Sequence, residues 1–123
     1  MPLRLQIENF LTLENGEAIS VAVPETGLTV GRGASMGWVL PDASLHVSAH
    51  HFDALGHGET WILQDRSTNG TYLQGERQRL DHPHRLRHGD RFQVGPYIVV
   101  ALIEGPADLP EPPPGWPGGP PLD

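Results

Sequence analysis

The chain consists of short segments in which apolar and polar residues alternate. Leu3, Leu5 and Ile7 are separated by polar side chains, and this period of two is typical of a strand with one buried face. The same alternation, or a short apolar run bounded by turn residues, recurs at 19–23, 28–30, 38–40, 52–55, 61–63, 71–73, 92–94 and 97–103. No window combines helical spacing of apolar residues with capping residues. The pattern predicts an all-β sandwich or barrel.

Turn residues stand between these segments. Asn69-Gly70 lies between the runs 60–64 and 71–73, and Asn-Gly between two β-forming runs predicts a tight strand-to-strand reversal. Asn15-Gly16 is a second turn signal, and Pro24 with Gly27 marks a third.

The composition changes at Gly105. Eight of the thirteen prolines follow that residue, and such a segment cannot pair into a sheet. We therefore predict a domain at 1–104 and a proline- and glycine-rich linker or tail at 105–123, extended or disordered. A polyproline ligand for an aromatic groove is the alternative for this tail.

Charge and composition limit the classes of function. The chain has 123 residues, a net charge of −7, no lysine and no cysteine. An acidic chain is a poor candidate for nucleic-acid binding, and the missing cysteines exclude disulfides and thiol catalysis. No apolar run approaches the length of a membrane span or a signal-peptide core. We expect a cytoplasmic protein without direct membrane insertion.

Four polar residues stand where predicted strands end. Arg32 follows the strand at 28–30, Ser48 precedes the strand at 52–55, and Thr68 and Asn69 belong to the predicted turn before 71–73. A guanidinium offers a planar fork of donors that matches phosphate oxygens, and hydroxyls donate to the same anion. Loop ends of a β-scaffold are frequent binding positions. The combination predicts a phosphopeptide site.

Three motifs in order, Gly31-Arg32, Ser48-x-x-His51 and Ser67–Thr71, resemble the signature of forkhead-associated (FHA) domains, over about 3–103. The resemblance implies a SMAD/FHA-like eleven-stranded β-sandwich that binds phosphothreonine at one end, with no cofactor and no enzymatic activity. It also implies roles for individual residues: phosphate contacts from Arg32 and Ser48 with help from Thr68, a peptide main-chain contact from Asn69, and architectural roles for Gly31, His51 and Gly70.

The chain departs from the usual FHA pattern at two places. Ala49 and His50 stand where a basic or polar residue is common, and Gln74-Gly75 stands where Asn-Gly is frequent. We include His50 among the phosphopeptide-binding candidates. A histidine titrates near ~6.5 and a bound dianion favours its cation, whereas the phosphate loses charge below its own second pKa of about 6, so binding should be tightest at about pH 6–7 and weaken toward about pH 8. The alternative is that His50 points to solvent.

A finer resemblance concerns the stretch 38–42 leading into Val47-Ser48, with a proline-rich segment after the domain. It is similar to the N-terminal FHA domain of the bacterial type VI secretion FHA subunit. This implies a phosphothreonine-containing partner, either a kinase or a secretion-system component, in a pathway downstream of a Ser/Thr kinase. The alternative function is a phosphate-independent scaffold or assembly domain.

Other motifs point to other chemistry. Gly33–Gly37 matches the G-x-S-x-G nucleophile elbow, but that motif requires a following helix and a strand is predicted instead. Ser48, His51 and Asp53 lie too close together on one segment for a catalytic triad. Seven histidines raise the question of a metal, yet no carboxylate stands at a characteristic spacing, and we predict no metal site.

Five of the eight arginines cluster at Arg77, Arg79, Arg85, Arg87 and Arg91. Two interpretations remain open for them. They are either solvated charges at strand edges, which discourage edge pairing, or a basic patch for acidic partners.

Overall fold

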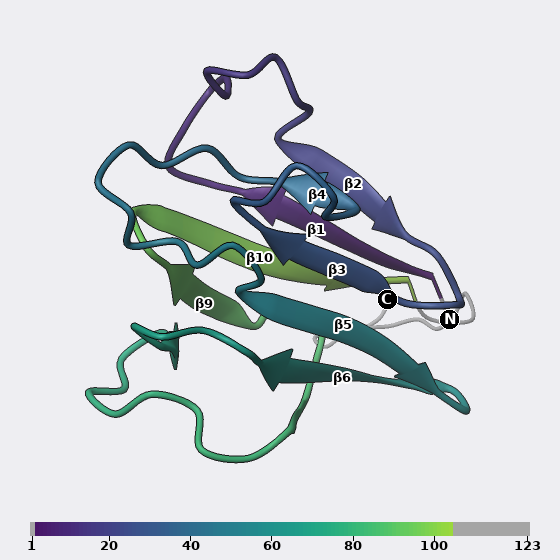
Figure 1. The fold of residues 1–123 in the computed structure, drawn as a ribbon. Coiled ribbons are helices and arrows are strands. Elements are labelled where there is room, and N and C mark those ends of the chain that lie inside the picture. Colours follow the sequence, from purple (N-terminus) through teal and green to yellow (C-terminus); the bar gives the residue numbers. More distant parts are fainter. Residues whose placement is uncertain (1, 105–123) are drawn as a thin grey trace, which may run out of the picture.

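A computed structural model describes residues 2–104 as two five-stranded β-sheets (Figure 1). The first sheet has the order β2-β1-β10-β9-β7 and the second has the order β4-β3-β5-β6-β8. The strands of the first sheet are β1 (Leu3–Ile7), β2 (Ser20–Val23), β7 (Thr71–Leu73), β9 (Arg91–Val94) and β10 (Tyr97–Ile103). Those of the second are β3 (Leu28–Gly31), β4 (Trp38–Val39), β5 (Phe52–His57), β6 (Thr60–Asp65) and β8 (His84–Arg85). No helix occurs among these residues, so the all-β prediction is confirmed.

The core lies between the sheets, as the alternation predicted. Leu3, Leu5 and Ile7 on β1 are almost completely buried, whereas Arg4 between them is exposed. Phe52 on β5 and Phe92 on β9 meet edge to face, with ring centroids 5.3 Å apart, a favoured geometry for aromatic pairs. Since one ring comes from each sheet, this contact joins the two layers.

The predicted hairpin at Asn69-Gly70 is wrong. β6 and β7 belong to different sheets, and Thr71 pairs with Val94 on β9 instead of with β6. A two-residue hairpin of type I′ requires positive φ at both central residues, but here only Gly70 has it, at 101°. The segment is therefore a loop that crosses from one sheet to the other.

Two further differences concern strands. The described residues form ten strands, one fewer than the FHA resemblance implied. β8 was not predicted, because His84 and Arg85 lack alternation and follow a proline. The predicted tail at 105–123 lies outside the described residues.

The sheet register determines which loops meet. Val30 pairs with Phe52, and Phe52 pairs with Asp65. The end of β3, the start of β5 and the end of β6 therefore lie side by side. The segments 32–37, 40–51 and 66–70 emerge together at this end of the sandwich (Figure 1).

Candidate functional site

Backbone contacts hold the loop after β3 against the loop before β5. The amide of Arg32 donates to the carbonyl of Ser48 at 2.9 Å, and the amide of Gly33 donates to that of Ala49 at 3.0 Å. A Cβ atom on Gly31 would lie 2.3 Å from the Ala49 carbonyl oxygen, a distance that no side chain tolerates. Glycine at this position lets the two loops touch.

The Arg32 side chain is anchored at one nitrogen only. Its Nε donates to the carbonyl of Val47 at 3.0 Å, which orients the guanidinium plane. Its two terminal nitrogens contact no acceptor within residues 2–104, and no carboxylate pairs with it there. The arrangement leaves an exposed, charged fork of donors available to an anion.

The Ser48 hydroxyl is bonded to the loop 66–70. The backbone amide of Thr68 donates to Ser48 Oγ at 2.9 Å, so this oxygen acts as an acceptor toward the protein. Its own hydrogen has no acceptor within the described residues. Because a hydroxyl accepts and donates at once, Ser48 can donate that hydrogen to a bound anion.

His51 connects the loops 40–51 and 66–70 through hydrogen bonds. It is completely buried. The amide of Ser48 donates to Nδ1 at 3.0 Å, and Nε2 lies 3.1 Å from the carbonyl of Gly70. These partners assign the proton to Nε2, which donates to Gly70. Burial lowers the pKa of His51 below 6.5, although the Gly70 contact and Asp65 act in the opposite direction. The ring is therefore neutral and supports the two loops.

Asp65, at the end of β6, organises the loop 66–70. Its Oδ1 accepts from the amide of Ser67 at 3.2 Å and from the hydroxyls of Ser67 and Thr71 at 2.6 and 2.8 Å. Ser67 Oγ in turn accepts from the amide of Gly70 at 2.7 Å. Burial alone would raise the pKa of Asp65, but hydrogen bonds from Ser67, Arg79 and Thr71 outweigh it and lower that pKa below 3.8. The carboxylate is the acceptor around which the loop closes.

Arg79 clamps the outside of the same loop. One terminal nitrogen, Nη2, lies 2.7 Å from Asp65 Oδ2 and 2.6 Å from the carbonyl of Ser67, and Nη1 donates to the carbonyl of Thr68 at 2.9 Å. The sequence left two interpretations of this arginine cluster open, solvated charges at strand edges or a basic patch for acidic partners, and Arg79 fits neither. No sequence motif indicated this role of Arg79, because Arg79 and Asp65 are 14 positions apart in the sequence.

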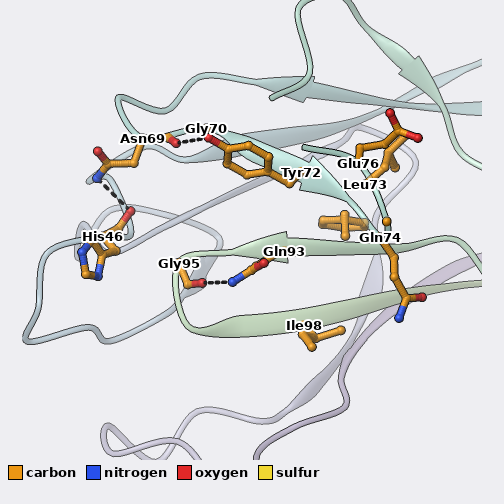
Figure 2. Close-up of a pocket in the computed structure, with 12 residues that line it drawn as sticks. His46, Asn69, Gly70, Tyr72, Leu73, Gln74, Glu76, Gln93, Gly95 and Ile98 are labelled. Atoms are coloured by element: carbon orange, nitrogen blue, oxygen red, sulfur yellow. Dashed lines mark hydrogen bonds between the residues drawn. The ribbon is translucent and has the colours of Figure 1, made fainter. Parts of the chain in front are cut away.

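Thr68 and Asn69 lie at the exposed tip of the clamped loop. Asn69 Nδ2 donates to the carbonyl of His46 at 3.3 Å, and the Tyr72 hydroxyl donates to the carbonyl of Asn69 at 3.3 Å. Beside them runs a groove of about 450 Å³ (Figure 2). Leu73, Phe92 and Ile98 contribute apolar walls to it. An extended peptide held at Asn69 would have space to continue along this groove.

The His50 ring is bonded to the protein through one of its two nitrogens. Its Nε2 lies 2.5 Å from Asp53 Oδ1, and Arg66 Nε donates to the other oxygen of Asp53 at 3.0 Å. Its Nδ1 has no partner in the described part of the chain. The ring is thus fixed at one nitrogen, and the other nitrogen is available for a ligand.

The structure gives no basis for the competing enzymatic motifs. The amide of Met36 donates to the carbonyl of Gly33 at 3.1 Å and closes a turn, and strand β4 follows. Ser35 therefore precedes no helix. Ser48 reaches His51 through its backbone amide, not through its hydroxyl, and Asp53 pairs with His50. Within residues 2–104, no three histidine, aspartate or glutamate residues cluster as a metal site would require. No described helix is long and apolar enough to cross a membrane.

A family model for the FHA domain matches residues 28–95, more than half of the chain. Over 80 residues, the chain is 32% identical to the probable serine/threonine-protein kinase fhkA of Dictyostelium discoideum. The match covers 58% of this chain but 13% of that kinase, so the chain spans only a small part of the relative's length.

Solved FHA structures share the fold. A structure from a study of phosphothreonine-dependent FHA domain interactions has a TM-score of 0.68 and 24% identity, covering 85% of this chain and 99% of that chain. The N-terminal FHA domain of S. cerevisiae Rad53p, in complex with a phosphothreonine peptide, has a TM-score of 0.67 and 22% identity over 85% and 94% of the two chains.

The FhaA FHA domain, complexed with the intracellular domain of Rv3910, has a TM-score of 0.64 and 25% identity over 80% and 98% of the two chains. The two-sheet architecture, the loops gathered at one end and the family match lead to one conclusion: the chain belongs to the FHA domain family, whose members are binding modules.

Proposed function

We propose that this protein is a phosphothreonine-dependent binding module and that the loop end of the sandwich is its ligand site. The observation that carries the proposal is the state of Arg32. Its guanidinium is oriented by one bond to Val47 and keeps two unpartnered nitrogens among the described residues. Ser48, whose hydroxyl hydrogen has no acceptor in the described part of the chain, belongs to the loop that Arg32 contacts through its backbone.

The other site residues have complementary roles in this proposal. Arg32 and Ser48 bind the phosphate, Thr68 assists through its exposed hydroxyl, and Asn69 bonds the peptide main chain. Gly31, His51 and Gly70 support them, because they hold the loops together. Two of the structural neighbours come from phosphothreonine work, one of them with a bound phosphothreonine peptide, which supports the assignment.

His50 adds a pH-dependent contact in this scheme. While Nε2 donates to Asp53, a neutral ring carries no proton on Nδ1 and presents a lone pair to the phosphate. Only the imidazolium donates at both nitrogens. Donation from Nδ1 to a phosphate therefore requires a protonated His50.

The partner in our proposal is a protein phosphorylated on threonine by a Ser/Thr kinase. The similarity to a probable Ser/Thr kinase supports a connection with kinase signalling. The resemblance of the stretch 38–42, with the proline-rich sequence after residue 105, supports a role in assembling or regulating a bacterial type VI secretion system. The chemistry of the site requires only the phosphothreonine.

Calorimetric titration of the full chain against a phosphothreonine peptide library tests the proposal. We expect binding of a subset of phosphopeptides and none of their unphosphorylated counterparts. Equal binding of both forms would support the alternative, a phosphate-independent scaffold that uses the same sandwich.

A further inference from the structure

A second groove lies at the opposite end of the sandwich from the phosphopeptide loops. Its volume is about 500 Å³, and its walls include Thr60, Trp61 and Ile103 together with the segment 85–88. β6 runs from Thr60 in this groove to Asp65 at the loop end, five positions further along the chain. At about 3.3 Å per residue, the two ends are separated by roughly 17 Å. A ligand in this groove does not contact Arg32.

Two arginines in the groove lack the partners that other arginines have. Arg66, Arg79 and Arg91 each form an ion pair with a carboxylate. Arg85 and Arg87 line the groove, are exposed, and have no side-chain hydrogen bond or ion pair within residues 2–104. In a chain with a net charge of −7, two cations only two positions apart and without an ion pair in the described structure form a local basic site.

His88 adds a donor to the same site. The backbone amide of Ile103 donates to His88 Nδ1 at 3.0 Å, so the neutral ring carries its proton on Nε2. That N–H has no acceptor in the part of the chain that the structure describes. Among the described residues, Glu59 is the one carboxylate that lines the groove, and it pairs with neither arginine. The groove therefore suits an anionic ligand, and its aromatic and aliphatic walls suit a ligand that also has apolar side chains.

The chain itself supplies a segment of this chemistry. Residues 105–123 lie outside the described structure, but their sequence contains Asp108, Glu111 and Asp123 and no arginine, lysine or histidine. Leu109 stands between the first two acids. The described chain leaves β10 at Ile103, which lines the groove, so Asp108 follows after only five residues. At most about 17 Å of extended chain separates the two positions.

We propose that the groove at Arg85, Arg87 and His88 is a docking site for the chain's own acidic segment 108–111. Asp108 and Glu111 pair with the two guanidinium groups, which match carboxylates in shape and charge. Covalent attachment gives the segment a high effective concentration, in the millimolar range for short linkers, so weak exposed ion pairs suffice to hold it. Docking would keep the segment at the end of the domain away from the phosphopeptide.

Paramagnetic relaxation in the full chain tests this proposal. The chain has no cysteine, so Ala107→Cys accepts a single nitroxide label next to the acidic segment. We expect strong broadening of the amides of Thr60, Leu86 and His88. Removal of two exposed arginine–carboxylate contacts by R85Q/R87Q should lower the docked-to-undocked ratio by about fivefold and reduce that broadening accordingly. The reciprocal change D108N/E111Q should have the same effect.

Arg77→Gln is the matched control, because Arg77 is also exposed and has no side-chain partner within residues 2–104, but does not line the groove. It should leave the broadening unchanged. Equal broadening in the R85Q/R87Q variant and the parent would overturn the proposal. So would insensitivity to D108N/E111Q, since the groove would then serve a different acidic ligand.

Discussion

The Arg79 clamp gives a sharp prediction for a residue that sequence motifs do not identify. Arg79→Ala removes three donor contacts, to Asp65, to the carbonyl of Ser67 and to the carbonyl of Thr68. Asp65 loses a charge-assisted hydrogen bond of about 1.5–3 kcal/mol. Water can replace the arginine at the two carbonyls, since Arg79 is exposed. We therefore expect the free energy of unfolding to fall by about 1–2 kcal/mol.

Phosphopeptide affinity should fall as well, although Arg79 touches no ligand in our proposal. Without the clamp, Ser67 and Thr68 gain freedom that binding must remove, at a cost of about 1–2 kcal/mol because the amide of Thr68 stays bonded to Ser48. This corresponds to a loss of about five- to thirtyfold in affinity. Calorimetry of the folded variant measures it, with urea unfolding as the parallel stability assay.

Two controls separate positioning from general destabilisation. Arg77→Ala changes a nearby arginine that has no side-chain partner in the described structure, and it should alter neither quantity. If Arg79 acts by placing Thr68, the losses from Arg79→Ala and Thr68→Ala will combine less than additively in the double variant. Unchanged affinity in folded Arg79→Ala would refute the reasoning.

Four further predictions follow from the site. Gly31→Ala should destabilise the fold by about 2–4 kcal/mol in urea unfolding, because its Cβ would lie 2.3 Å from a carbonyl oxygen; a neutral effect would contradict the observed loop contact. Burial holds the pKa of His51 below 6.5, so stability should be full above that value and decline as pH falls through it, because the unfolded chain binds a proton that the folded chain does not; His51→Gln should flatten this decline, and an equally steep one in the variant would contradict the assignment. Phosphothreonine should bind about 10–200-fold more tightly than phosphoserine if its methyl group fills a fitted space near Asn69, whereas equal affinities of paired peptides would indicate a nonspecific anion site. Phosphopeptide affinity should fall in His50→Ala, because the change removes the proposed contact between Nδ1 and the phosphate, and unchanged affinity in calorimetry would reject the contact from His50.

Most strands were predictable because their apolar residues alternate with polar ones or form a short continuous run. Alternation located β1, and the continuous apolar run located β10, with the bounds that the structure has. Pairing was less predictable, as the Asn69-Gly70 loop shows. Local turn signals there favoured a hairpin, but the buried pairing of Thr71 with β9 places the next strand in the other sheet. A turn signal such as Asn-Gly describes only the local backbone preference. It does not indicate in which sheet the next strand pairs.

The ligand candidates were visible in the sequence as motif positions, whereas the groups that orient them were not. Val47 orients Arg32 through a backbone carbonyl, an atom that every residue carries. His50 can pair with Asp53 because it lies near the surface, whereas the adjacent His51 is buried in the core. Such contacts depend on tertiary placement, so no spacing rule reveals them.

The central claim is that Arg32 binds a phosphate on threonine. One calorimetric experiment tests it most directly: a single peptide from the library, with and without its phosphate, titrated into the parent and into Arg32→Ala. A bidentate charge-assisted contact contributes roughly 1.5–3 kcal/mol or more. We predict that the parent binds only the phosphorylated peptide and that folded Arg32→Ala loses about ten- to hundredfold or more in affinity. Undiminished binding by a folded Arg32→Ala variant would contradict the account.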